Sequence, residues 1–365
     1  MLYLFLQYLA YHTAVKIPSV FFYSSTRMVL AAITTLLLTI LLGPWCINKL
    51  YKLKTGQSIR VEDCPTLAEL HQKKKKTPTM GGVLILISML IALLLWMDPR
   101  SSFTWILGVA TVWLGFLGGI DDYLKMKHKN SKGLRAKAKF GLQLLFAALL
   151  AVYLIWMGGY EAYFLPFKKT PFFIAGGAVF FLLTIVVVTG SSNAVNLTDG
   201  LDGLASGCTL LVALVFGVFA FLSNNVTIAH YLNIPYIEGS AEIAIYLSAM
   251  AGACLGFLWY NGYPAQVFMG DTGSLALGGI LGTAAVLMRR EFLLALVGGV
   301  FVLEALSVIL QVFSYRFRNK KRIFRCAPLH HHFEFKGWPE PKVVVRFWMI
   351  GLILALFGLA SIKFQ

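Results

Sequence analysis

The chain of 365 residues is 58% hydrophobic and only 13% charged, and its mean hydropathy is +0.74. An ordinary soluble domain carries about 25% charged residues, so the composition excludes that class. The formal net charge is +16, which we attribute to membrane sidedness and to attraction by anionic lipid headgroups. We therefore expect a membrane as a partner and no nucleic acid.

Ten apolar segments are long enough to cross a bilayer, which takes about 20 residues each. They lie near 20–48, 79–98, 102–122, 139–157, 171–190, 204–222, 241–259, 266–288, 291–314 and 346–363. This pattern predicts an all-α polytopic membrane protein with about ten transmembrane helices, and we expect residues 1–365 to form one domain. Residues 1–15 lack the basic start and the cleavage site of a secretory signal, so we expect an interfacial helix there.

Lysine and arginine residues are concentrated in three of the loops between these spans. The loops after spans one, three and nine (49–76, 125–139 and 316–346) hold 8, 7 and 9 of the 32 basic residues. The positive-inside rule places these loops in the cytoplasm, together with the loops that follow spans five and seven. The same rule predicts that both termini lie outside.

A polar stretch at Ser191–Gly207 interrupts the apolar pattern on the predicted cytoplasmic side. It contains amides, carboxylates and glycines, namely Asn193, Asn196, Asp199, Gly200, Asp202, Gly203 and Gly207. Carboxylates beside a span are costly unless they face a polar cavity or a partner, and glycine lets the backbone approach a ligand closely. A polar turn with an Asn or Asp helix cap explains this stretch, taken alone, equally well.

Two other predicted cytoplasmic loops carry polar groups next to a span. Lys73–Lys76 fits a topogenic basic patch, while Thr77–Gly82 fits either a ligand-binding backbone or a plain helix start. Asp121 and Asp122 lie four and three residues before Lys125, so these side chains can share one helix face. They fit helix caps or a salt bridge as well as a Mg²⁺ or proton-transfer site.

The last two predicted cytoplasmic loops add an amide, an aromatic ring, a carboxylate and histidines. Asn261 and Phe268 could hydrogen-bond to and stack on a heterocycle, and Asp271 lies in a loop without basic residues and needs a cation as partner. Glu304 lies deep in span nine, where a buried structural carboxylate explains it better than a proton path. His330–His332 fit a metal site or hydrogen-bond donors to phosphate or sugar.

Together these loops hold the groups that phosphoryl transfer from a soluble nucleotide to a lipid phosphate requires. A metal ion would neutralise a diphosphate, lysines would stabilise the transition state, and a carboxylate would deprotonate the acceptor. The alternative from another class is a secondary transporter, which predicts acidic residues near the bilayer midplane. Of the acids considered, only Glu304 lies deep in a span. A scaffold without activity would leave the polar loops unexplained.

Six segments carry a resemblance to a known family. They are TPTMGG (77–82), DDYLK (121–125), NAVNLTDGLDGLA (193–205), GDTGSLALGG (270–279), EALSVILQV (304–312) and PLHHHFEFKGWPE (328–340). They resemble the MraY family, the phospho-N-acetylmuramoyl-pentapeptide transferases, within the polyprenyl-phosphate N-acetylhexosamine-1-phosphate transferase superfamily. The resemblance covers nearly the whole chain.

The resemblance implies an enzyme that joins UDP-N-acetylmuramoyl-pentapeptide to undecaprenyl phosphate. The products would be lipid I and UMP, in the first membrane step of peptidoglycan synthesis. It further implies Mg²⁺ as cofactor, a homodimer, and an active site on the cytoplasmic face of the bacterial inner membrane. A relative that transfers N-acetylglucosamine-1-phosphate is the nearest alternative, and the histidine segment argues against it. Direct attack by the lipid phosphate and a covalent phospho-enzyme both stay open.

The resemblance also implies roles for particular residues. Asp271 would be the principal Mg²⁺ ligand, and Asp121 would deprotonate the lipid phosphate with Asp122 beside it. The implied groups are Lys125 and Lys137 for the phosphates, Lys74, Gly200, Asn261 and Phe268 for uridine, and Asn193, Asn196, Asp199 and Asp202 for the nucleotide and active-site loop. His330, His331 and His332 would contact the sugar-peptide side. We expect further substrate contacts at Thr79, Gly270, Ser274, Gln311 and Ala327, and we count Asp121, Asp122, Asp271, Lys74, Lys125 and His330 as catalytic.

Overall fold

The computed structural model describes residues 2–13, 17–53, 74, 77–128, 133–158, 162–174 and 176–363. Nearly all of their regular structure is helical. The elements are α1 (Leu2–His12), η1 (Ser19–Phe22), α2 (Ser24–Lys52), α4 (Gly82–Trp96), α5 (Ser102–Lys127), α6 (Ala136–Met157), β1 (Ala162–Tyr163), β2 (Phe173–Ile174), α7 (Gly177–Thr198), α8 (Leu204–Ser223), α9 (Val226–Tyr231), α10 (Ala241–Asn261), α11 (Gly270–Leu287), α12 (Glu291–Val297), α13 (Gly299–Phe317), α14 (Leu329–Glu334) and α15 (Glu340–Ala360). The two short strands pair antiparallel, with Ala162 opposite Ile174.

Within the described ranges, nine helices are long and apolar enough to cross a membrane. The tenth expected span is α4, which has 15 residues and is therefore about 22 Å long. It ends just before Asp98-Pro99, where proline disfavours a helical conformation in the preceding residue. These helices confirm the predicted all-α polytopic membrane fold. The helix expected within residues 1–15 is α1, and its place at an interface stays a prediction.

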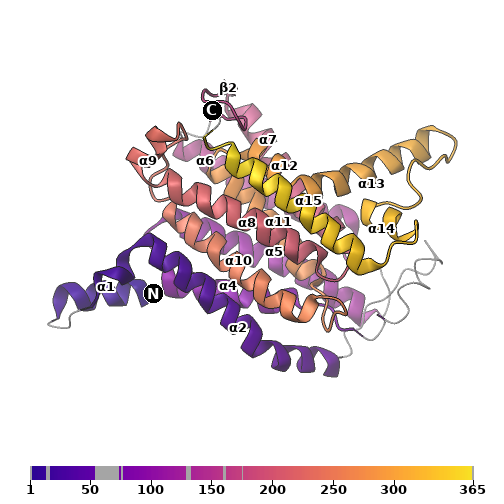
Figure 1. The fold of residues 1–365 in the computed structure, drawn as a ribbon, viewed down its shortest axis with the longest axis horizontal. Helices are drawn as coiled ribbons and strands as arrows, with labels where there is room; N and C mark the ends of the chain where they lie inside the picture. Colours follow the sequence, from indigo (N-terminus) through magenta and orange to yellow (C-terminus); the bar gives the residue numbers. More distant parts are fainter. Residues whose placement is uncertain are drawn as a thin grey trace.

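The bundle is organised around α10 and α11, which are buried on nearly all sides. Helices α2 and α8 pack on α10, and α5 and α7 pack on α11. Figure 1 shows both chain termini toward one end of the bundle and α14 at the other end. Helices α2, α6, α13 and α15 leave rows of large apolar side chains exposed, including Leu41, Trp156, Phe313 and Leu356, as expected for faces that contact lipid.

The polar stretch at Ser191–Gly207 differs from the loop that we expected between spans five and six. Helix α7 continues to Thr198, and α8 begins at Leu204, so only Asp199–Gly203 forms a turn. The helix can continue because its polar side chains find partners on other helices. Ser192, for example, donates to the main-chain oxygen of Leu275 in α11 (2.8 Å). The amides of this stretch are therefore held on a rigid helix.

Span nine, expected at 291–314, consists of two helices. Helix α12 ends at Val297 and α13 begins at Gly299, with Gly298 between them. Two consecutive glycines have low helix propensity, which explains a break at this point. The break lets α13 take its own direction, and Figure 1 shows α13 extending away from the bundle toward α14.

Candidate active site

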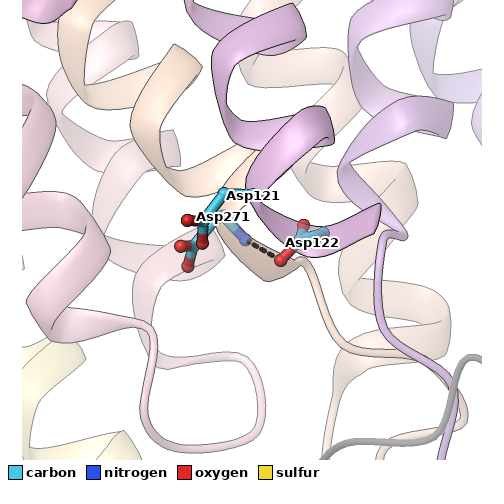
Figure 2. Close-up of side chains that lie close together, drawn as sticks. All are labelled: Asp121, Asp122 and Asp271. Carbon is cyan, nitrogen blue, oxygen red and sulfur yellow. Dashed lines mark hydrogen bonds between the residues drawn. The ribbon is translucent and has the colours of Figure 1, made fainter. Parts of the chain in front are cut away.

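Three carboxylates meet where the end of α5 lies against the start of α11. Asp121 and Asp122 lie near the end of α5 and Asp271 lies in the first turn of α11, and a ligand oxygen of each lies within 4.8 Å of the others. Gly118 makes this approach possible, because a Cβ there would overlap the main-chain oxygen of Asp271. The sequence prediction that these aspartates act together is consistent with their position in Figure 2.

Asp122 has a different environment from its neighbour. Its carboxylate accepts hydrogen bonds from the main-chain nitrogens of Asp271 (3.2 Å) and Thr272 (2.9 Å) and from the Thr272 hydroxyl (2.8 Å). Figure 2 shows Asp122 directed at the main chain of Asp271. Asp122 therefore caps the amino terminus of α11, where unpaired N–H groups and the helix dipole favour a negative charge.

Two lysines neutralise part of this cluster. Lys125 Nζ lies 2.6 Å from Asp121 Oδ2 and 2.8 Å from Asp271 Oδ2. Lys139, in the first turn of α6, contacts the same Asp271 oxygen at 2.5 Å and Asp121 at 3.7 Å. Three carboxylates face two ammonium groups, so the cluster keeps an excess of negative charge when all five groups are ionised. All of the acidic ligand atoms are oxygens, which hard divalent cations prefer, so the cluster could hold a metal ion.

The amides of α7 extend this cluster. Asn196 donates to Asp271 Oδ1 and to the Ser274 hydroxyl, both at 2.8 Å. Asn193, about one turn earlier, donates to Gln143 of α6 (2.8 Å). Asn196 is thus at the carboxylates, whereas Asn193 donates to Gln143 of α6 and to Thr189 O of its own helix (2.8 Å), and so helps to fix how α6 and α7 pack.

The turn between α7 and α8 places Asp199 at the edge of the same cluster. The main-chain N–H of Gly270 lies near the Asp199 carboxylate and favours its charged form. Desolvation in this enclosed position, followed by repulsion from Asp271 and Asp122, raises the pKa of Asp199 to about 8. The turn therefore contributes a carboxyl group that gains a proton more readily than a free aspartate does.

A second ionic group lies beyond this turn and contains Lys74. Lys74 Nζ lies 2.6 Å from Asp202 Oδ1 and 2.5 Å from Glu340 Oε1. Its ammonium also lies 5.9 Å from the ring centroid of Phe268, within cation–π range. Lys74, Asp202 and Phe268, which the resemblance assigned to nucleotide recognition, are therefore neighbours. The other basic-patch residues, Lys73, Lys75 and Lys76, lie outside the described residues.

Main-chain hydrogen bonds hold the segment that contains Thr79 against the segment that contains Phe268. The nitrogen of Phe268 donates to Pro78 O, and the nitrogen of Gly81 donates to Phe268 O, both at 2.8 Å. Gly270 has φ +73°, and a Cβ there would meet Thr79 Oγ1 at 2.8 Å. Thr79 and Gly270 therefore line one place beside the carboxylates, where only glycine fits without strain.

Asn261 is buried and uses its amide within the chain. Its oxygen accepts from Gly203 N (3.1 Å) and Ser206 Oγ (3.0 Å), and its nitrogen donates to Val267 O (2.9 Å). These bonds join the start of α8 to the Phe268 segment. In this structure Asn261 shapes the region around the expected heterocycle pocket, and its amide is satisfied by the chain itself.

Gln311 of α13 forms hydrogen bonds with the segment between α13 and α14. Gln311 accepts from the nitrogens of Ile323 and Phe324 and donates to Phe324 O, each at 3.0 Å. His332 Nδ1 accepts from Arg325 N at 3.1 Å. These contacts place Ala327 and α14 at the end of the bundle that holds the carboxylates.

The three histidines of α14 face different partners. His331 Nδ1 lies 2.6 Å from Glu334 Oε2, while His330 lies near Glu304 of α13 (3.2 Å). Three neighbouring histidines with three separate partners do not form one metal site in the described structure. Glu304, expected to be a buried structural carboxylate, is buried and has a histidine from the loop beyond span nine as its neighbour.

Lys139 and Glu340 are site residues that the sequence did not single out. Lys137, which was chosen instead, does not contact the carboxylates among the described contacts. Lys137 is exposed, and Lys139, two residues on, is the lysine at the carboxylates. A signal was present, because Lys139 and Gln143 are four residues apart and share one face of α6, whereas Lys137 lies on another face. Glu340, which also accepts from Asp202 N (2.8 Å), follows a proline and resembled an ordinary acidic first turn.

The fold and the site together define an integral membrane protein with a buried carboxylate and lysine site at one end of its helix bundle. A family model described as glycosyl transferase family 4 matches residues 104–289, and the phospho-N-acetylmuramoyl-pentapeptide-transferase signature 1 matches residues 74–86. The chain belongs to the phospho-N-acetylmuramoyl-pentapeptide-transferase family, as its similarity to curated members shows.

Three such relatives carry that name. The protein from Protochlamydia amoebophila is 56% identical, with 99% of each chain covered. The protein from Francisella tularensis subsp. tularensis is 50% identical over 93% of this chain and 94% of the relative. The protein from Desulfotalea psychrophila is 48% identical over 97% of this chain and 98% of the relative. The similarity therefore extends over the spans and every loop that contributes to the site.

Proposed function

We propose that the protein transfers phospho-N-acetylmuramoyl-pentapeptide from its UDP-linked donor to undecaprenyl phosphate, producing lipid I and UMP. The observation that carries this proposal is the Asp121–Asp122–Asp271 cluster with Lys125 and Lys139 bound to it. A phosphoryl-transfer site needs groups that position and neutralise phosphate oxygens, and this cluster holds them at the end of a membrane bundle. The names of the full-length relatives supply the donor class.

We propose Mg²⁺ as the ion that the carboxylates hold. The residues fit this ion, because three carboxylates carry more negative charge than the two lysines neutralise and because Mg²⁺ prefers oxygen ligands. Asp271 would be the principal ligand of the ion, since Asp122 is engaged as the cap of α11 and Asp121 is the proposed base. When bound, Mg²⁺ supplies charge neutralisation for the diphosphate of the donor.

The chain's own residues then have separate tasks. Asp121 would take the proton of the lipid phosphate, and Lys125 and Lys139, now bound to Asp271, would turn to incoming phosphate oxygens. Direct attack by the lipid phosphate needs only this positioning and neutralisation, so we favour it over a covalent phospho-enzyme. Asn196 would keep Asp271 oriented through its 2.8 Å hydrogen bond.

The Lys74 group would receive the nucleotide. Phe268 would stack on the uracil ring, and Lys74 would hold its place through Asp202 and Glu340. We assign the histidine helix α14 to the sugar and peptide of the donor, as the resemblance implies. We further propose a homodimer in the bacterial inner membrane as one domain, with the site on the cytoplasmic face and both termini outside, from the distribution of basic residues.

The test is UMP release by the purified protein in detergent. The protein receives the UDP-N-acetylmuramoyl-pentapeptide donor, undecaprenyl phosphate, both, or neither, each with Mg²⁺ or with a chelator. We expect UMP only when donor, lipid phosphate and Mg²⁺ are all present. UMP from donor alone would support a phospho-enzyme instead, and UMP from UDP-N-acetylglucosamine but not from the muramoyl donor would overturn the proposed substrate.

A further inference from the structure

His330 and Glu304 form a fully buried pair behind the active-site turn. Both residues have an exposed fraction of 0%. The main-chain nitrogen of His330 donates to Glu304 Oε1 (3.2 Å), and ring atom Nδ1 lies 3.2 Å from the same oxygen. Nδ1 and Glu304 Oε1 interact electrostatically without a hydrogen bond, because their geometry does not meet hydrogen-bond criteria. Glu304 thus fixes His330 by its backbone and by one edge of its ring.

The opposite edge of the ring is pressed against Gly200. Nε2 has no hydrogen-bond partner, and a Cβ built on Gly200 would overlap it. The Cα–H bond that such a Cβ would replace therefore points at Nε2. Because the ring is in contact with the chain on both edges, a substrate cannot touch Nε2 unless the turn moves away.

Gly200 lies between the two halves of the site. The carboxylate of the preceding residue, Asp199, interacts with the N–H of Gly270, next to Asp271. Two residues further on, Asp202 pairs with Lys74 at 2.6 Å. A change in the position of Gly200 would therefore move the carboxylate half and the Lys74 half relative to each other.

We infer that His330 and Glu304 are positioning residues, which hold the Asp199–Gly203 turn in place and do not contact substrate. The inference rests on the proposed function for its kinetic consequences, though not for its structural ones. It replaces the catalytic role that the sequence suggested for His330. The chain of contacts runs from Glu304 on α13 through His330 on α14 to Gly200, and then to both halves of the site.

The same geometry assigns the tautomer of His330. A bare Nδ1 carries partial negative charge and would be repelled by Glu304 Oε1 at 3.2 Å even without direct alignment, so Nδ1 carries the proton. A lone pair on Nε2 facing the Gly200 Cα–H makes a weak attractive contact, whereas an N–H there would meet another hydrogen. The geometry therefore favours the ring proton on Nδ1, with Nε2 facing the turn.

The first test measures the tautomer without any substrate. Protein labelled with ¹⁵N-histidine is compared with the His330→Ala variant, and the signal that disappears belongs to His330. We expect one protonated and one bare ring nitrogen in the His330 signal. The cross-peaks between ring nitrogens and ring protons should identify the protonated nitrogen as Nδ1. A ring protonated at Nε2, or at both nitrogens, would overturn the assignment.

The second test uses UMP release from four variants. Gly200→Ala and His330→Ala should each lower kcat/KM, and the double variant should lose less than the product of the two losses, because both changes act at one contact. Glu304→Gln, whose amide oxygen can still accept the His330 main-chain N–H, should keep most of the activity and the same tautomer. Gly190→Ala is the control, because a Cβ at Gly190 on α7 has nothing within 4 Å.

The outcomes separate the positioning role of His330 from a direct role on the substrate. Multiplicative losses in the double variant would overturn the positioning role, and so would a large loss in His330→Ala with no effect of Gly200→Ala. If the wild type releases no UMP, the proposed function fails while the tautomer measurement still decides the buried pair.

Discussion

Two buried ionic groups lie at opposite ends of the bundle, and they differ in how their charge is balanced. At the end away from the site, Arg27 of α2 and Glu242 of α10 are each 5% exposed and lie 2.8 Å apart. Arg27 also donates to Trp96 O (3.0 Å), and Glu242 accepts from Asp98 N (2.9 Å). One positive and one negative group, joined to the end of α4, form a neutral structural connection.

The carboxylate cluster has a different composition. Asp121, Asp122 and Asp271 share Lys125 and Lys139, which leaves a net negative charge with carboxylate oxygens within 4.8 Å of one another. Like charges this close cost free energy in a site of low dielectric. A balanced pair needs nothing more from outside the chain, whereas an unbalanced cluster is stabilised by binding a cation. The excess of charge, more than burial, distinguishes the binding site from the structural pair.

The largest effect is expected from Asp271→Asn. Asparagine keeps the size of the side chain but removes the charge that would attract the cation and hold both lysines, so we expect UMP release to fall by about 10³-fold. Thermal unfolding in detergent should stay close to wild type, because the substitution reduces repulsion in the cluster. A variant that keeps more than a tenth of the activity would show that Asp271 is not the centre of the site.

Breaking the balanced pair should affect stability instead of chemistry. Glu242→Leu leaves Arg27 buried without its partner, and we expect the free energy of unfolding to fall by about 3 kcal/mol. The double variant Arg27→Met with Glu242→Leu should recover most of this loss, since no uncompensated charge remains. Denaturation curves give the stability, and UMP release per folded molecule should not change. A loss of turnover at full stability would contradict the structural role.

The next prediction separates two lysines that are two residues apart. Lys139→Met should lower kcat by about 100-fold, because Lys139 contacts Asp271 and Asp121. Lys137→Met should stay within about twofold of wild type, since Lys137 is exposed. Initial rates at saturating donor give both values. The reverse order would restore the assignment that the sequence suggested.

These two lysines show how far the sequence alone could predict the site. The span positions, the roles of Asp121, Asp122 and Asp271, and the nucleotide roles of Lys74 and Phe268 were expected from hydropathy, sidedness and resemblance, whereas Glu340 of the Lys74 group was not. The spacing of Lys139 and Gln143 puts both on one face of α6, but the rotation that turns this face toward α11 depends on side-chain packing between helices. Lys139 became identifiable only once Gln143 was seen to share its face toward α7.

The turn after α7 and the histidines show the same limit. A run with asparagine and serine resembles a loop, but Asn193 and Asn196 have partners on other helices, so α7 stays helical through Thr198. Tertiary partners override local preference in such cases. Likewise, three adjacent histidines have three different surroundings, because α14 is packed between α13 and the turn with Gly200.

The smallest effect is expected at the nucleotide end of the site. Phe268→Ala should raise the KM for the UDP-linked donor about tenfold or more, since stacking on a base contributes about 1–3 kcal/mol. The value of kcat should fall less, because the ring lies beside Lys74 and not at the carboxylates. The main-chain bonds of Phe268 to Pro78 and Gly81 do not involve its side chain, so the local fold should persist.

Phe268→Tyr is the matched control, because it keeps an aromatic face and should leave the donor KM close to wild type. Full initial-rate curves against donor concentration separate KM from kcat for both variants. A fall in kcat with unchanged KM in Phe268→Ala would contradict stacking and would indicate that the ring supports the Lys74–Asp202 pair instead. In that case the nucleotide end would resemble the Arg27–Glu242 pair, and uracil recognition would have to come from polar groups on the neighbouring turn.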